Sequence, residues 1–213
     1  NVKFIFISTC SNYGFKKNVI AKEETSLNPK SLYAEQKVSI EKYILSLKNK
    51  STFEPVILRF ATAFGNSKRP RFDLTVNEFV LNAFLNKRID IYDHLTWRPY
   101  CHVKDFCKVI YKVLKFKKKL NFEIFNVGSN NNNMRKIDIV KKIKKHLPNF
   151  KFEIIKSSKD PRNYKVNFNK IKNKLNIKSF STIDYGIREM IKYLRKNKNN
   201  SKLLISGNYL IKK

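Results

Sequence analysis

The chain has 213 residues, of which 42% are hydrophobic and 13% aromatic. This is enough for one globular core, or for one domain plus part of another. No apolar run approaches the ~18 residues that a membrane span needs, and the apolar stretch at the start is too short for a signal peptide. The three cysteines, Cys10, Cys101 and Cys107, are too scattered for a disulfide framework or a zinc site. We therefore expect a cytoplasmic protein with no membrane partner and no metal.

The net charge is +30 at pH 7, from 46 Lys and Arg against 16 Asp and Glu. Such an excess suggests a nucleic-acid partner. The lysines are spread along the chain, however, and runs such as 117–119 and 141–145 fit solvated helix faces. We therefore expect no nucleic-acid partner, and we keep a non-catalytic basic binding module as an alternative function. Polyanionic small ligands are compatible with this charge.

Hydrophobic periodicity predicts strands and helices that alternate along the chain. Strands are expected at residues 3–8, 55–60, 89–92, 123–127 and 151–155. Helices are expected at residues 30–48, 74–87, 103–115, 135–146, near 168–175 and at 182–196. Residues 9–30 are predicted to form a polar loop and residues 197–213 a tail. The alternation is typical of an α/β fold with a parallel sheet.

The chain starts at Asn1 and enters a strand of buried character almost at once, so we expect it to begin within a domain. It contains five glycines: Gly14, Gly65, Gly128, Gly186 and Gly207. No two of them have the spacing of a G-x-G-x-x-G turn, which cradles the phosphates of a dinucleotide. The sequence therefore predicts that this phosphate loop is absent from the chain.

Tyr33 and Lys37 lie four residues apart in the helix predicted at 30–48, so they share one helix face. That face continues through Ile40, Ile44 and Leu47, which is the spacing of a core-facing surface. A lysine there needs a partner, because burying an ammonium group is costly. Its charge would lower the Tyr33 pKa from a reference near ~10 towards the range of a proton-transfer catalyst. A surface Tyr/Lys pair is the alternative.

Five segments, in this order, resemble the motifs of the extended short-chain dehydrogenases, the NAD-dependent nucleotide-sugar epimerases and dehydratases. They are Phe6–Gly14, Tyr33-x-x-x-Lys37, Leu58–Gly65, Trp97–Asp105 and Phe125–Gly128. The resemblance implies the C-terminal part of a Rossmann-type doubly wound parallel sheet, from residues 1–60 and 93–128. It also implies a smaller α/β substrate-binding domain, from residues 61–92 and 129–196. Such enzymes open with a glycine-rich half of ~100–120 residues, so we expect this chain to be an N-terminally truncated piece that is inactive alone.

The resemblance implies that Thr9, Tyr33 and Lys37 are the catalytic residues. Tyr33 would take a proton from a sugar hydroxyl and return it, and Thr9 would hydrogen-bond the sugar oxygen. Lys37 would lower the Tyr33 pKa and bind the nicotinamide ribose of NAD or NADP, the implied cofactor. A threonine that only caps a turn is the alternative for Thr9. Phe60 and Ala61 would line the nicotinamide, with core packing at a strand end as the alternative.

The resemblance also implies substrate-binding roles, with a nucleotide-diphosphate sugar as the partner. The residues concerned are Thr9, Thr62, Asp73, Leu74, Tyr92, Arg98 and Arg162. Arg98 would grip the diphosphate, which a guanidinium fork fits well. Tyr92 would lie against the nucleobase, with a buried aromatic side chain as the alternative. Asp73 would equally suit the N-cap of the helix at 74–87.

The two residues that follow Thr9 bear on the reaction type. In 4,6-dehydratase relatives the catalytic threonine is followed by Asp and Glu, an acid/base pair for the loss of water, whereas Cys10 and Ser11 stand here. The resemblance therefore implies an NAD(P)-dependent nucleotide-sugar epimerase, most simply a 4-epimerase, with a 4-ketoreductase or a 4,6-dehydratase as alternatives. Cys10 lies near the place of a proton-abstracting cysteine in some epimerases, and a buried structural cysteine is the alternative. The full-length protein is expected to be a homodimer.

Overall fold

A parallel three-stranded sheet forms one side of the molecule in the computed structural model, which describes residues 2–48, 54–156 and 160–198. Its strands are β1 (Lys3–Thr9), β3 (Glu54–Phe60) and β7 (Glu123–Val127), with β3 in the middle. From Pro55 onward every residue of β3 is buried, as expected for a parallel strand that is paired on both edges and covered on both faces. The predicted strands at 3–8, 55–60 and 123–127 are confirmed.

Three further sheets complete the strand pairing of the described residues. Within them β4 pairs parallel with β6, β6 pairs antiparallel with β8, β5 pairs parallel with β9, and β2 pairs parallel with β10. These strands are β2 (Phe15–Ala21), β4 (Thr62–Phe64), β5 (Arg88–Tyr92), β6 (Trp97–His102), β8 (Asn133–Arg135), β9 (Lys151–Ile155) and β10 (Asn163–Val166). The pairing of β2 with β10 brings a late part of the chain beside the segment that follows Thr9.

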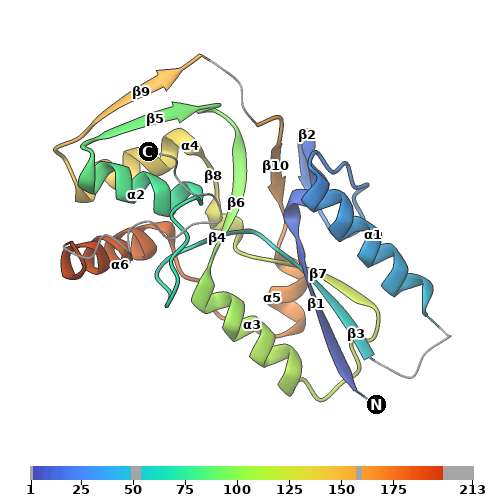
Figure 1. Cartoon of the computed structure of the whole chain (residues 1–213). Coiled ribbons are helices and arrows are strands. Elements are labelled where there is room, and N and C mark those ends of the chain that lie inside the picture. Colours follow the sequence, from blue (N-terminus) through green and yellow to red (C-terminus); the bar gives the residue numbers. More distant parts are fainter. Residues whose placement is uncertain (1, 49–53, 157–159, 199–213) are drawn as a thin grey trace.

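Helices separate most of the strands, as the periodicity predicts, and Figure 1 shows them on the outside of the sheets. They are α1 (Leu32–Ser46), α2 (Thr75–Leu85), α3 (Val103–Lys115), α4 (Lys136–His146), α5 (Asn169–Lys174) and α6 (Ile183–Lys196). All six agree with the predicted helices to within a few residues at each end. The mixed α/β architecture with parallel pairing confirms the predicted fold class. The part of the predicted tail beyond residue 198 lies outside the described residues.

The prediction of one polar loop over residues 9–30 is wrong. This stretch contains the 3₁₀ helix η1 (Cys10–Tyr13) and the strand β2. Two features of the backbone shape this stretch. Gly14 adopts a φ of 61°, and the Asn28 backbone N–H donates to the Asn12 carbonyl at 2.8 Å. Because β2 pairs only with the distant β10, its strand character depends on a tertiary contact that local propensity does not reveal.

Two buried clusters form the interior. The first core joins the three-stranded sheet to α3 and to residues 164–177, and includes Val56, Leu58, Val109 and Phe125. The second core joins α2, α4 and α6 around β5, and includes Phe79, Ile89, Ile143 and Met190. Residues 164–177 therefore pack with the sheet, although they fall within the predicted substrate-binding domain of residues 61–92 and 129–196. β6 lies between the two, because Tyr100 belongs to the second core and Cys101 to the first.

The predicted core-facing stripe of α1 is wrong for most of its residues. Tyr33 is 54% exposed and Ile40 is 42% exposed, and Lys37 and Leu47 are only half-buried. The buried residues of α1 are Ala34, Val38, Glu41 and Ile44. This face starts one residue later than the predicted one, a rotation of ~100° about the helix axis. The predicted stripe followed the apolar residues Ile40, Ile44 and Leu47, whereas the helix buries the charged Glu41.

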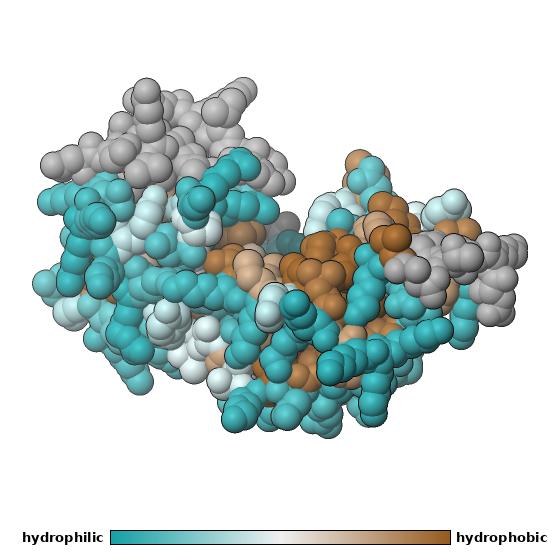
Figure 2. Space-filling model, turned by 90° about the horizontal axis from the view of Figure 1, so that it is seen from below, coloured by the Kyte–Doolittle hydropathy of each residue, from teal (hydrophilic) through white to brown (hydrophobic). Residues whose placement is uncertain are grey.

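The surface is largely hydrophilic, with a hydrophobic area near the middle of the face seen from below (Figure 2). Large apolar side chains are exposed on β1 and α1, among them Phe4, Ile7, Ile40 and Tyr43. Only one edge of β1 is paired among the described residues, so this strand presents an apolar edge that is open to further pairing. None of the described helices combines the length and the apolar character that spanning a membrane requires.

Candidate active site

The carboxyl ends of the parallel strands bring Thr9, Phe60 and Val127 to one edge of the main sheet. Thr9 is in register with Phe60, and Phe60 is in register with Val127. Ligands of open α/β sheets bind at this edge. The N-terminal end of α1, which carries Tyr33, lies at the same edge (Figure 1). Thr9 and Tyr33 are therefore placed at the same end of the sheet.

Thr9 is the last residue of β1 and the N-cap of η1. Its Oγ1 accepts a hydrogen bond of 3.1 Å from the Ser11 backbone N–H, so the turn-capping alternative is observed. A hydroxyl group has one proton and two acceptor lone pairs. Capping therefore leaves the Thr9 proton and one lone pair for a ligand.

Tyr33 and Lys37 lie on the side of α1 that borders β1. The helix begins after Ser31, whose Oγ accepts a hydrogen bond from the Ala34 backbone N–H at 3.3 Å. Lys37 Nζ donates to the Ile7 carbonyl at 2.8 Å and lies 5.8 Å from the centre of the Tyr33 ring. The ammonium group is thus fixed two residues before Thr9, and the exposed Tyr33 ring stands next to it.

A buried ion pair lies one helical turn below Lys37. Glu41 and Arg59 have side chains that are 2% and 3% exposed, and Arg59 Nη2 lies 2.6 Å from Glu41 Oε2. Arg59 Nε donates to both carboxylate oxygens at 3.1 Å, and Ser8 Oγ donates to Glu41 Oε1. Glu41 therefore ties α1 both to β3 and to the residue before Thr9.

The network extends from Arg59 to the neighbouring elements. Arg59 Nη1 donates to Tyr13 Oη and to the Glu23 carbonyl, both at 3.0 Å. Tyr13 Oη donates in turn to Asn126 Oδ1 at 2.8 Å. The Asn126 backbone N–H donates to Glu23 Oε1 at 2.8 Å. These bonds join β1, η1, α1, β3 and β7 beneath the carboxyl edge, so they fix the elements that carry Thr9, Tyr33 and Lys37.

Cys10 belongs to this interior rather than to the crevice. It is fully buried, and its Sγ donates to the Arg59 carbonyl at 3.1 Å. Burial raises the pKa of the Cys10 thiol far above its ordinary value, in spite of the nearby Arg59 charge. The structure therefore favours a structural cysteine over a proton-abstracting one.

Two arginines and one aspartate form a compact cluster beside η1. Arg98 Nη2 lies 2.9 Å from Asp160 Oδ2. Arg162 binds the same carboxylate with two hydrogen bonds, Nε to Oδ1 at 2.8 Å and Nη2 to Oδ2 at 2.7 Å. Burial works to raise the pKa of Asp160, but the bonds from Arg162 and the charge of Arg98 together hold it well below its usual range. The cluster is therefore a carboxylate held by two guanidinium groups.

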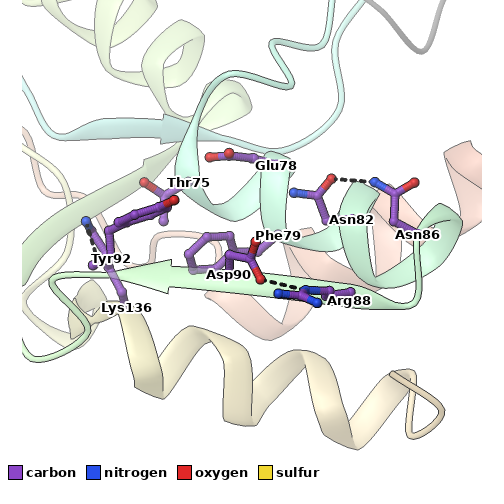
Figure 3. A pocket seen from close by; sticks show the side chains of 9 residues that line it. All are labelled: Thr75, Glu78, Phe79, Asn82, Asn86, Arg88, Asp90, Tyr92 and Lys136. Carbon is purple, nitrogen blue, oxygen red and sulfur yellow. Dashed lines mark hydrogen bonds and ion pairs between the residues drawn. The ribbon is translucent and has the colours of Figure 1, made fainter. Parts of the chain in front are cut away.

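A pocket of about 370 Å³ lies between α2, β5 and the start of α4 (Figure 3). This volume is within the range of small-molecule sites. The lining residues are Thr75, Glu78, Phe79, Asn82, Asn86, Arg88, Asp90, Tyr92 and Lys136. Lys136 Nζ donates to the Tyr92 carbonyl at 2.9 Å, so Tyr92 and Lys136 stand together at one end of the pocket. Burial, and then the charge of Arg98, lower the pKa of Lys136.

Short contacts lead from the pocket to Thr9. Lys136 Nζ is 4.0 Å from Asp93 Oδ2, which accepts a hydrogen bond of 3.1 Å from the Asp160 backbone N–H. Asp160 binds Arg162, and Arg162 Nη1 lies 3.4 Å from Ser11 Oγ. The Ser11 backbone N–H then binds Thr9. A pocket lined by two acidic and two basic side chains, a pair of guanidinium groups and a strand-end hydroxyl are thus connected in this order.

Several residues predicted from the resemblance lie away from this path. Phe60 and Ala61 are each 4% exposed and belong to the first core, where the Phe60 ring packs 4.0 Å from that of Phe106. Thr62 lies in β4, paired with Tyr100. The prediction that Asp73 caps α2 is wrong, because the N-cap is Leu74 and the Asp73 carboxylate binds Arg71.

Five further residues belong to this arrangement and were not predicted as site residues. Lys136, Asp160 and Asp93 connect the pocket to the arginines, and Glu41 and Arg59 support the edge of the sheet. A signal for the second pair was available: a glutamate four residues after Lys37 and an arginine inside an otherwise apolar strand each need a partner when buried. Lys136, Asp160 and Asp93 give no local signal in the sequence, because they come from three separate segments.

Comparison with known proteins agrees with this geometry. Residues 1–128 match the NAD dependent epimerase/dehydratase family. An uncharacterized UDP-glucose epimerase of Bacillus subtilis is 34% identical over 126 residues, 59% of this chain and 39% of that protein. Among solved structures, dTDP-glucose 4,6-dehydratase from Bacillus anthracis in complex with NAD is similar with a TM-score of 0.82 and 27% identity, over 95% of this chain and 64% of the other.

The fold is also that of UDP-glucuronic acid 4-epimerase from Bacillus cereus in complex with UDP-glucuronic acid and NAD. That structure has a TM-score of 0.80 and 23% identity, over 91% of this chain and 62% of the other. The chain thus spans less than two thirds of the length of the relatives that it matches. With more than half of its residues matched, and with the strand order and site geometry described above, the chain belongs to the NAD dependent epimerase/dehydratase family.

Proposed function

We propose that the full-length protein is an NAD(P)-dependent nucleotide-sugar epimerase, most simply one that inverts C4 of the sugar. The observation that carries this proposal is the path from the pocket through the two arginines to Thr9. A nucleotide-diphosphate sugar has a nucleoside, two phosphates and a sugar in the same order. Tyr92 and Lys136 suit the nucleoside end, guanidinium groups suit phosphate oxygens, and hydroxyl groups suit the sugar.

In this proposal Tyr33 is the acid/base at the sugar. Its phenol oxygen would accept the proton of the sugar hydroxyl during oxidation and return it during reduction. The Thr9 proton, which capping leaves available, would hydrogen-bond the same sugar oxygen. Lys37, fixed on the Ile7 carbonyl, places a positive charge beside the Tyr33 ring.

The residues at the carboxyl edge fit one end of the cofactor. The Lys37 ammonium group and the exposed Tyr33 phenol suit a ribose and a nicotinamide. The backbone of Phe60 and Ala61 lies nearby. When bound, the cofactor would accept a hydride from the sugar carbon and return it. The sequence offers no G-x-G-x-x-G turn for the pyrophosphate, so that contact would come from outside this chain.

Epimerisation is favoured over 4,6-dehydration by the residues after Thr9. Dehydration needs an acid and a base to remove water, but Cys10 is buried in the core and Ser11 contacts Arg162.

The full-length protein is proposed to form a homodimer. The exposed side chains of Ile40 and Tyr43 on α1 support this assembly, because large exposed apolar side chains mark interaction surfaces. A cytoplasmic location stays a prediction.

Product analysis tests the proposal. The full-length protein would be incubated with UDP-glucose and catalytic amounts of NAD, and the products separated by chromatography and examined by NMR. We expect the C4 epimer to accumulate with no net change in NADH absorbance. Stoichiometric consumption of NADPH with a 4-keto substrate would indicate a reductase instead, and a 4-keto-6-deoxy product would indicate a dehydratase. Either outcome without epimer would contradict the proposed reaction.

A further inference from the structure

The cluster of Arg98, Asp160 and Arg162 already holds an anion. The Asp160 carboxylate lies where the two guanidinium groups converge, with Arg98 Nη2 at 2.9 Å and Arg162 Nη2 at 2.7 Å from the same oxygen. Phosphate oxygens and carboxylate oxygens use the same guanidinium donors in the same fork geometry. A diphosphate and Asp160 would therefore compete for the same donors.

Arg98 is closed off in this arrangement. Its side chain is 5% exposed, and its Nη1 donates to the Trp97 carbonyl at 3.0 Å and to the Arg162 carbonyl. Its Nη2 is buried and, although close to Asp160, makes no well-aligned hydrogen bond within the described part of the chain. A buried guanidinium donor without an aligned acceptor is unusual and unfavourable. The contact with Asp160 thus neutralises the charge of Arg98 without satisfying the donors on Nη2.

The backbone around Asp160 links this contact to the rest of the path. The Asp160 backbone N–H donates to Asp93 Oδ2 at 3.1 Å, and its Oδ1 accepts from the Arg162 backbone N–H at 3.1 Å. Release of the carboxylate from Arg98 would therefore leave Asp160 anchored at its backbone. The side chain can leave the guanidinium groups while the segment keeps its place.

We propose that Asp160 is the affinity-setting residue of the diphosphate site: its carboxylate occupies Arg98 and Arg162 in the free protein and has to be displaced by the phosphates of the ligand. The proposal rests on the proposed function for the identity of the natural ligand, but the competition itself concerns any phosphate-bearing anion. Part of the binding free energy of such a ligand is spent on breaking the internal ion pair. Removing the Asp160 charge should therefore strengthen phosphate binding.

The test measures binding of inorganic pyrophosphate by titration calorimetry to the chain and to its Asp160→Asn variant. Asparagine keeps the size of the side chain and removes its charge. We expect the variant to bind pyrophosphate at least about tenfold more tightly, the change that corresponds to losing one competing charge-assisted contact. The fluorescence of Trp97, the single tryptophan, should respond to the titration in both proteins because its carbonyl binds Arg98.

Asp184→Asn is the matched control. It removes the same charge from a carboxylate that pairs with Lys142 and His146 on the other side of the fold, so pyrophosphate affinity should stay unchanged. Unchanged or weaker pyrophosphate binding by a folded Asp160→Asn variant would overturn the proposal, because Asp160 would then organise the arginines rather than compete for them. Tighter pyrophosphate binding combined with no binding of UDP-glucose by either protein would uphold the competition and contradict the proposed function.

Discussion

Replacing Glu41 with alanine is expected to lower the free energy of unfolding by about 3–5 kcal/mol, the cost of leaving one member of a buried ion pair without its partner. Arg59 would keep its charge in a position where its side chain is only 3% exposed. It would lose its contacts with both carboxylate oxygens, and Ser8 Oγ would lose its acceptor. Chemical denaturation followed by circular dichroism measures the difference.

Gln36→Ala is a suitable control, because Gln36 lies on the same helix and is exposed. This substitution should change the stability by less than about 0.5 kcal/mol. Joint replacement by Glu41→Leu and Arg59→Met should recover part of the loss, since no lone charge is left buried. The recovery is expected to be incomplete because Tyr13 Oη and the Glu23 carbonyl also lose a donor. A fully stable Glu41→Ala variant would show that the pair contributes nothing to the fold.

Replacing Tyr33 with phenylalanine in the full-length protein is expected to lower the turnover number by about 10²–10⁴-fold, the usual contribution of a general acid/base. The substitution removes one oxygen from a side chain that is 54% exposed, so the fold should be unaffected. The KM for the nucleotide sugar should change little, because we propose that Arg98 and Arg162, not Tyr33, bind the diphosphate. Steady-state kinetics with UDP-glucose measures both quantities.

Tyr43→Phe is the matched control for this experiment. Tyr43 lies on the same helix and is 65% exposed, but it is ten residues further along α1, away from the carboxyl edge. The substitution removes only the hydroxyl group and keeps the apolar ring that the proposed dimer contact would use, so turnover should stay unchanged. Equal rates for the Tyr33→Phe variant and the unaltered protein would remove Tyr33 from the reaction.

Much of the fold could be predicted from the sequence, because its main strands are short apolar runs between helices of clear periodicity. Residues 55–60 and 123–127 are examples, and both proved to be strands of the parallel sheet. β2, β4, β6, β8 and β10 were not predicted, because they are short or polar, or in β6 contain a proline, and become strands only through pairing with distant partners. Local propensity is a weak guide to such strands.

The site was predictable where its residues belong to local motifs. Thr9, Tyr33 and Arg98 were proposed in this way, and Thr9 and Arg98 lie on the path described above. The orientation of α1 was not predictable from apolar spacing, since the buried Glu41 replaces an apolar residue on the core-facing side. The contact of Asp160 with Arg98 was also not predicted, because it joins residues 62 positions apart. It depends on the position of β10 beside β6, where the Trp97 backbone N–H donates to Asn163 Oδ1.

Calorimetric titration with UDP-glucose tests the central claim most directly, because it measures whether the arginine cluster holds the diphosphate of a nucleotide sugar. Arg98→Met is expected to weaken binding about 10- to 100-fold, the range for losing hydrogen bonds from a charged group. Arg195→Met, on the exposed end of α6, should bind as tightly as the unaltered chain. Affinity that is unchanged in a folded Arg98→Met variant would contradict the assignment of this site.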